Sequence, residues 1–157
     1  MKSLKYGMNM HMIPVLAPVD LGASTIRTTH VNASQALSAA FLINFGVITN
    51  DTVNITIEES TSATTTGAEA IGFGYRQSGD TATDTWGAVT TCDSAGTSFV
   101  HTAIDNTDMW IEIDMAGLSE DCNYLCVKIV AGSDPSLMAA TAFLETRYGQ
   151  YDHVSTT

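Results

Sequence analysis

Residues 52–58 read TVNITIE, and this stretch decides the fold that the sequence predicts. Val53, Ile55 and Ile57 are apolar and alternate with polar residues, so hydrophobic side chains recur at every second position. Successive side chains of a β-strand point to opposite faces, whereas an α-helix repeats about every 3.6 residues. The period of two therefore predicts a strand with one buried face and one solvated face.

The same alternation recurs along the chain and favours an all-β protein. Four further segments carry it: residues 41–48 (FLINFGVI), 71–75 (IGFGY), 109–115 (MWIEIDM) and 124–129 (YLCVKI). The first of these is apolar on both faces, which is typical of a central strand. Residues 134–148 fit either a helix that starts after Asp134-Pro135 or a buried strand, and we favour the strand.

Short segments rich in Gly, Asn, Asp and Ser separate these runs, as turns between strands do. About eight short strands with this spacing predict an antiparallel β-sandwich or a barrel rather than an α/β fold. A chain of 157 residues is long enough to bury one core. We expect an N-terminal arm at residues 1–15, the sandwich at 16–148 and a C-terminal tail at 149–157.

The charge balance argues against several classes of partner. Six Lys and Arg stand against seventeen Asp and Glu, which gives a formal net charge of −11. The few bases are scattered, whereas binding to a phosphate backbone or an anionic membrane needs a basic cluster. We therefore expect no direct nucleic-acid partner and no membrane partner. No apolar run has the length of a signal peptide or a membrane span.

The cysteines predict free thiols rather than a disulfide framework. Cys92, Cys122 and Cys126 are an odd number. On a strand, the last two would share a face about 13 Å apart, which is too far for a bond. Buried reduced thiols are the favoured interpretation.

No motif points to catalysis, a cofactor or a metal. The four histidines (His11, His30, His101 and His153) lack zinc-binding spacing, and His101 falls on an expected strand. The neighbours Glu58 and Glu59 would point to opposite faces of a strand. Asp105, Asn106 and Asp108 allow a calcium site, but an Asx-rich turn is the preferred interpretation. We predict no catalytic, cofactor-binding or metal-binding residue.

Exposed aromatic and methionine side chains are the candidates for an interface. Trp110 is expected opposite the apolar face of its strand, where it could stack on a sugar, cover the strand or anchor a subunit contact. The last two uses are preferred. The methionines near the N-terminus suit an irregular apolar contact or belong to a frayed leader. The candidate interface residues are Met8, Met10, Met12, Trp110, Tyr148 and Tyr151.

Several segments together resemble the small structural proteins of tailed bacteriophages. They are residues 39–49 (AAFLINFGVIT), 53–60 (VNITIEES), 74–79 (GYRQSG), 84–88 (DTWGA), 108–114 (DMWIEID) and 143–148 (FLETRY). The likeness covers most of residues 25–150 as a pattern of strands and turns. The methionine-rich start and the cysteines depart from it.

This resemblance implies a jelly-roll-like head decoration, or cement, protein without catalytic residues or cofactors. Its implied partners are the major capsid protein and further copies of itself, as a homotrimer or homodimer. It would be made in the host cytoplasm and lie on the outer surface of the capsid, bound through its tails and one end of the sandwich. The alternatives are a phage neck or tail component and a carbohydrate-binding β-sandwich module.

Overall fold

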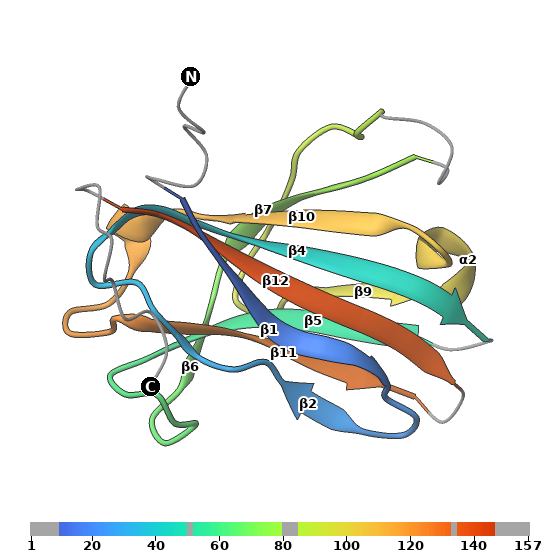
Figure 1. Cartoon of the computed structure of the whole chain (residues 1–157), viewed down its shortest axis with the longest axis horizontal. Helices are drawn as coiled ribbons and strands as arrows, with labels where there is room; N and C mark the ends of the chain where they lie inside the picture. Colours follow the sequence, from blue (N-terminus) through green and yellow to red (C-terminus); the bar gives the residue numbers. More distant parts are fainter. Residues whose placement is uncertain (1–9, 50–51, 80–84, 133–134, 147–157) are drawn as a thin grey trace, which may run out of the picture.

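The computed structural model describes residues 10–49, 52–79, 85–132 and 135–146. Within these residues the chain forms two antiparallel sheets that pack face to face as a β-sandwich (Figure 1). The predicted all-β sandwich is therefore confirmed. The described residues contain twelve strands rather than about eight. Five of the twelve have only two to four residues, which is too short for an alternating pattern to be recognised in the sequence.

The first sheet has six strands. In spatial order they are β1 (Met10–Asp20), β12 (Ser136–Thr146), β4 (Ala36–Ile48), β10 (Asp108–Ile113), β7 (Phe73–Gln77) and β8 (Thr90–Cys92). The central position predicted for residues 41–48 is confirmed, since β4 lies between β12 and β10. Figure 1 shows β1 and β12 running alongside each other at one edge.

The second sheet packs against the first, and the hydrophobic core lies between them. Its path is β2 (Thr25–Arg27), β11 (Tyr124–Ala131), β5 (Thr52–Ser60) and β6 (Glu69–Ile71). Two short strands join it from the side: β3 (Val31–Asn32) pairs with β11, and β9 (Thr97–Val100) pairs with β5. Two short helices, α2 (His101–Ile104) and the 3-10 helix η1 (Met115–Gly117), flank β10 in the chain.

The strand order is that of a jelly roll. The order β1-β12-β4-β10 in one sheet faces β2-β11-β5-β6 in the other, so early and late strands of the chain alternate in both sheets. Double-sheet jelly rolls have this interleaved topology. The strands β7 and β8 extend the first sheet beyond β10.

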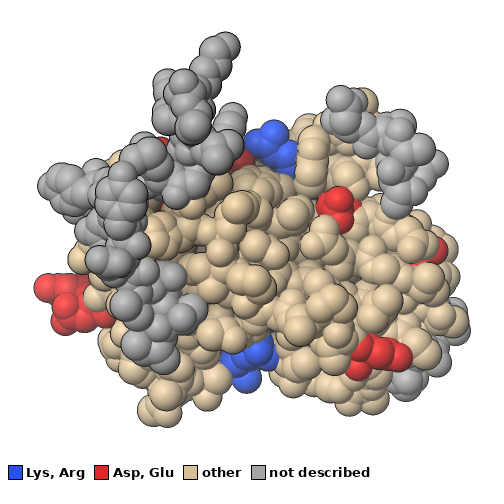
Figure 2. All heavy atoms as spheres, viewed as in Figure 1, with Lys and Arg blue, Asp and Glu red and all other residues tan. Residues whose placement is uncertain are grey.

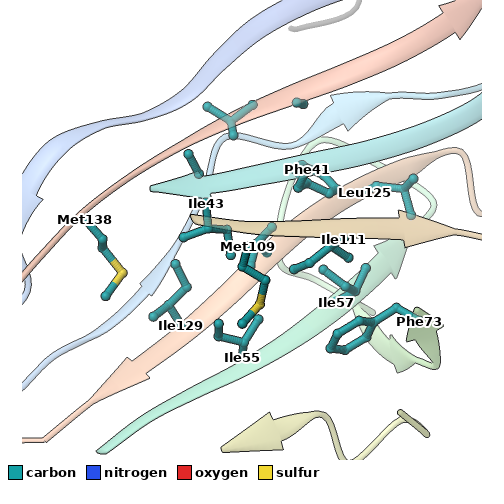
Figure 3. Packing of buried hydrophobic residues seen from close by; sticks show 14 of the residues in the cluster. Phe41, Ile43, Ile55, Ile57, Phe73, Met109, Ile111, Leu125, Ile129 and Met138 are labelled. Carbon is teal, nitrogen blue, oxygen red and sulfur yellow. The ribbon is translucent and has the colours of Figure 1, made fainter. Parts of the chain in front are cut away.

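The core lies between the sheets and consists of the side chains that the alternation marked as apolar. Val53, Ile55 and Ile57 are fully buried. Burying each such side chain contributes roughly 1.5–3 kcal/mol. Opposing residues from four strands meet in the close-up of Figure 3: Phe41 and Ile43 of β4, Met109 and Ile111 of β10, Ile55 and Ile57 of β5, and Leu125 and Ile129 of β11.

Residues 71–75 form two strands rather than the single strand predicted. Ile71 ends β6 in the second sheet, and Phe73 begins β7 in the first. Gly72 lies at the crossing, where an added Cβ would lie 2.9 Å from the backbone oxygen of Cys92. The chain can change sheets here because glycine allows this close backbone approach.

The structure confirms one further prediction, corrects another and leaves the two chain ends largely undescribed. The ambiguous segment 134–148 contains strand β12, as favoured. His101 begins α2 instead of lying on a strand, because the chain turns there to cross from β9 to β10, and buried Ile104 anchors that turn. The predicted arm at 1–15 overlaps β1, which begins at Met10; residues 1–9 and the tail at 149–157 lie outside the described residues. Within the described part of the chain, no helix has the length and apolar character that a membrane crossing requires.

Candidate binding surface

Strand pairing creates a row of side chains across the outer face of the first sheet. Directly paired residues of antiparallel strands point to the same face. From β1 through β12, β4 and β10 to β7, the paired residues are Pro14, Thr141, Leu42, Trp110 and Arg76. The row therefore links residues that are far apart in the sequence.

A second row beside it is also mostly apolar. Met12 pairs with Phe143, and Phe143 pairs with Ala40. The rings of Phe143 and Trp110 are in contact, with centroids 5.1 Å apart, which joins the two rows. Met12 is 63% exposed, so this apolar surface is open to solvent.

Farther along β12, on the same face, exposed Leu137 covers Gly46 of β4. The row between Leu137 and Thr141 contains Ala139, Asn44 and Asp108. We name the whole surface the apolar band, and its members are Met12, Pro14, Leu42, Trp110, Leu137, Thr141 and Phe143. Figure 2 shows that charged side chains are sparse on the face of the molecule in view. Exposed apolar side chains gathered on one face are typical of interaction sites in soluble proteins.

A groove lies at the β7 end of the band and is lined by Arg76, Trp86 and Trp110, with a volume of about 250 Å³. One carboxylate oxygen of Glu112 holds two of these side chains in place. It accepts a hydrogen bond from Trp110 Nε1 at 2.9 Å and one from Arg76 Nη2 at 3.0 Å. Trp86 comes from a separate segment, bridged to Ser78 beyond the end of β7.

The structure brings three of the six predicted interface residues to one face. Met10 and Met12 lie on β1, paired with Glu145 and Phe143, on the same side of the sheet as Trp110. Trp110 lies opposite buried Met109 and Ile111, as expected, but is half-buried rather than fully exposed. The other three, Met8, Tyr148 and Tyr151, lie outside the described residues. Their role as an interface stays a prediction.

The outer face of the second sheet carries an ion pair in which Glu58 is buried and Arg27 is partly exposed. Glu58 of β5 accepts hydrogen bonds from Arg27 Nε at 2.6 Å and Nη2 at 3.1 Å, and Lys128 Nζ lies 3.4 Å from Glu58 Oε1. Burial would raise the pKa of Glu58, but Arg27 and Lys128 outweigh it and hold the pKa below its usual value. The same hydrogen bond raises the pKa of Arg27.

Two further ionisable groups, Cys126 and His30, lie near this pair. Cys126 is directly opposite Glu58 in the strand register and fully buried; burial, with Glu58 adding to it, raises the pKa of its thiol to about 12. Burial also lowers the pKa of His30, whose Nε2 is buried without a hydrogen-bond partner among the described residues. All three cysteines are free, as predicted, but only Cys126 is buried; Cys92 and Cys122 are partly exposed.

Three other acids that the sequence analysis considered, Glu59, Asp105 and Asp108, accept hydrogen bonds within the fold. Glu59 points away from Glu58 and accepts hydrogen bonds from the backbone N–H and the hydroxyl of Ser119, at 3.0 and 2.5 Å. Asp105 accepts from the backbone N–H of Ile48, and Asp108 accepts from Asn44. Across the described ranges, no group of three or more His, Cys, Asp or Glu side chains could hold a metal ion.

Fold and surface together define a jelly-roll β-sandwich whose first sheet carries an apolar band on its outer face, with the charged residues Arg76, Asp108, Glu112 and Glu145 around it. No protein-family model and no curated protein sequence matches the chain.

Two similar solved structures come from infectious bursal disease virus: a chain of the T13 viral particle, at 12% identity, and a chain of the Gt strain, at 13% identity. Each likeness covers 91% of this chain, with a TM-score of 0.26. The chain spans 43% and 46% of the lengths of the chains it matches. These likenesses are too remote to carry an argument about function.

Sequence reasoning missed the groove and the Arg27–Glu58 pair. Trp86 and Arg76 carried no signal of their own, because their meeting with Trp110 depends on the order of β10 and β7 and on the Ser78–Trp86 bridge. The one available signal was that Trp110 alternates with apolar residues, and it pointed to the correct face.

Proposed function

We propose that this chain is a non-enzymatic structural protein of a virus particle, which binds neighbouring subunits through the apolar band. The observation that supports the proposal best is the set of exposed apolar side chains on the outer face of the first sheet. One face carries Arg27, Glu58 and Lys128 in an ion-pair cluster, whereas the other carries exposed Met12 and Leu137 within the apolar band.

The described bases support a protein partner rather than a nucleic acid. Arg27 and Lys128 both pair with Glu58, and Arg76 pairs with Glu112. Cations that already neutralise carboxylates form no basic surface for a phosphate backbone. An exposed apolar surface with half-buried aromatic side chains instead has the composition of a protein interface core.

The finer proposal is that the protein decorates the outside of a bacteriophage head. Its setting comes from the resemblance of its strands and turns to head decoration proteins, and jelly rolls are used by viral capsid and lectin domains alike. A decoration protein that binds only the assembled shell stabilises that shell by mass action. Self-association around a capsid axis as a homotrimer or homodimer would suit this position.

Rebinding to particles tests the proposal. Particles of the virus that encodes the chain are stripped of it, and purified protein is added back and quantified by sedimentation. We expect wild type to rebind. The variants Met12→Glu and Leu137→Glu should bind at least about tenfold more weakly, because each places a charge in the apolar band. The matched control is Val100→Glu, which makes the same kind of change at an exposed apolar residue of β9, in the second sheet.

Two outcomes would contradict the proposal. One is wild-type protein that stays monomeric in light scattering and does not bind stripped particles. The other is band variants that bind as well as Val100→Glu. The copy number in purified particles separates the finer alternatives, since decoration requires hundreds of copies and a neck or tail component is present in few.

A further inference from the structure

The groove at the end of the apolar band combines aromatic faces with polar groups. Trp86 is 41% exposed and Trp110 is half-buried, and Arg76 is paired with Trp110 in the strand register. The two indoles come from different segments, so the groove is made by the fold. Both tryptophans of the chain are in this one place.

The polar groups of the groove are oriented but incompletely used. One oxygen of Glu112 fixes Trp110 and Arg76, while its other oxygen has no hydrogen-bond donor in the part of the chain that the structure describes. Arg76 Nε is buried and likewise has no acceptor among the described residues. A buried donor without a partner is uncommon in folded proteins and calls for an explanation. Among the described residues, the groove thus offers aromatic surface, an open acceptor oxygen on Glu112 and the exposed part of the Arg76 side chain, which is 37% exposed.

Size and charge restrict what such a groove can hold. Its volume of about 250 Å³ lies below the roughly 300–1,000 Å³ of pockets for drug-sized ligands. The charges of Arg76 and Glu112 cancel, and the chain carries a net charge of −11, so an anionic ligand would be repelled. A small neutral ligand with an apolar face and several hydroxyl groups fits these limits.

We infer that the Arg76–Trp86–Trp110 groove binds a neutral hexose unit of a glycan. The C–H face of a pyranose ring packs on an indole, and its hydroxyls donate to the open oxygen of Glu112 and accept from the guanidinium of Arg76. The groove adjoins the apolar band and shares Trp110 with it, but Trp86 and Arg76 are outside the band. A virus-particle protein with such a site would attach the particle to neutral surface glycans.

Intrinsic fluorescence tests the inference directly, because both tryptophans line the groove. The purified chain is titrated with neutral gluco-, manno- and galacto-oligosaccharides, and with sialyllactose as the anionic counterpart. At least one neutral series should change the tryptophan emission in a saturable manner, and sialyllactose should bind more weakly than lactose.

Variants separate a role in binding from a role in folding. Trp86→Ala should weaken binding of the same sugar about tenfold or more (~1.4 kcal/mol), measured by calorimetry, and should keep the circular dichroism spectrum and melting temperature of wild type. Glu112→Gln, which keeps the size of the side chain, should weaken binding and leave the fold intact. The matched control, Val100→Ala, alters an exposed apolar residue of the other sheet and should bind as wild type does.

Three results would overturn the inference. The first is a complete lack of saturable binding by every neutral series. The second is unchanged affinity in Trp86→Ala, which would place the sugar elsewhere. The third is a groove that binds a proline-rich or aromatic peptide and no sugar. None of these results bears on the rebinding of the band variants to stripped particles, so the two proposals fail independently.

Discussion

Replacing Glu58 by glutamine is expected to destabilise the fold far more than the same change at an exposed glutamate. The strand register sets Arg27 of β2 directly opposite Lys128 of β11, and like charges in that position repel. Glu58 accepts hydrogen bonds from Arg27 and lies 3.4 Å from Lys128, so one carboxylate neutralises both cations. Glu58→Gln removes that charge and leaves the two cations facing each other.

The magnitude follows from burial and geometry. The side chain of Glu58 is 6% exposed, whereas those of Arg27 and Lys128 are 32% and 31% exposed. A hydrogen bond to a charged group contributes about 1.5–3 kcal/mol, and solvent around the partly exposed cations reduces that value. We expect Glu58→Gln to lower the free energy of unfolding by about 2 kcal/mol, which for a chain of this length is a fall of roughly 4–8 °C in melting temperature.

Urea unfolding monitored by far-UV circular dichroism measures the effect, because Trp110 donates a hydrogen bond to the control residue Glu112 and its fluorescence would change with that substitution. The control is Glu112→Gln. Glu112 is 51% exposed and pairs with the partly exposed Arg76, so its loss should cost less than about 1 kcal/mol.

The dependence on pH has a defined sign. The folded state holds the pKa of Glu58 below its usual value, so its contribution is present above the unfolded pKa of about 4.3 and is lost as the pH falls through the lower, folded pKa. Wild type and Glu58→Gln should therefore differ most above about pH 5 and converge in acid. Equal and small effects of Glu58→Gln and Glu112→Gln at neutral pH would refute this reasoning.

Three further predictions concern the backbone, a thiol and a histidine. Gly96→Ala should destabilise the fold by about 2 kcal/mol more than Gly67→Ala; both glycines have positive φ (79° and 71°), but only at Gly96 would the added Cβ clash with the backbone oxygen of Ile55. Equal urea midpoints for the two variants would exclude that clash. Cys126 should react with a thiol reagent at neutral pH far more slowly than the other two cysteines, because burial raises its pKa to about 12. Peptide mass spectrometry after timed labelling measures the three rates. Equal rates at all three cysteines would contradict the prediction. Burial lowers the pKa of His30 in the folded state, so the unfolded chain binds a proton at a higher pH and the fold loses stability between about pH 8 and pH 5. His30→Gln should reduce this loss of thermal stability. An unchanged dependence of the melting temperature on pH would count against this role.

The strands that the sequence predicted well are those with long alternation. Residues 52–58 and 109–113 show their apolar face buried at every expected position, because the pleat of one strand is enough to separate its two faces. The segment 71–75 has the same pattern and was predicted wrongly as one strand. Alternation shows which side chains share a face, but it carries no information on which sheet each residue joins.

In the candidate sites, too, the sequence predicted which face a side chain lies on but not which residues it contacts. Trp110 was placed on the outer face from its neighbours in the sequence alone. Its contacts with Arg76 and Phe143 bring together residues more than thirty positions apart, and Trp86 reaches the groove only through the bridge to Ser78. Likewise, Glu58 was recognised as pointing away from Glu59, while its partner Arg27 was not recognised, because β2 and β5 meet only through their common neighbour β11.

The sequence by itself determined that this chain forms strands, which side of each long strand is buried, and that the surface is acidic with few free bases. These properties depend on local backbone geometry and on composition, and both can be read without knowing the partners of any residue. Tertiary structure alone decided the jelly-roll strand order, the apolar band and the groove, since they depend on pairing between strands distant in the chain. That pairing results from burying the whole core at once, and no single segment specifies it.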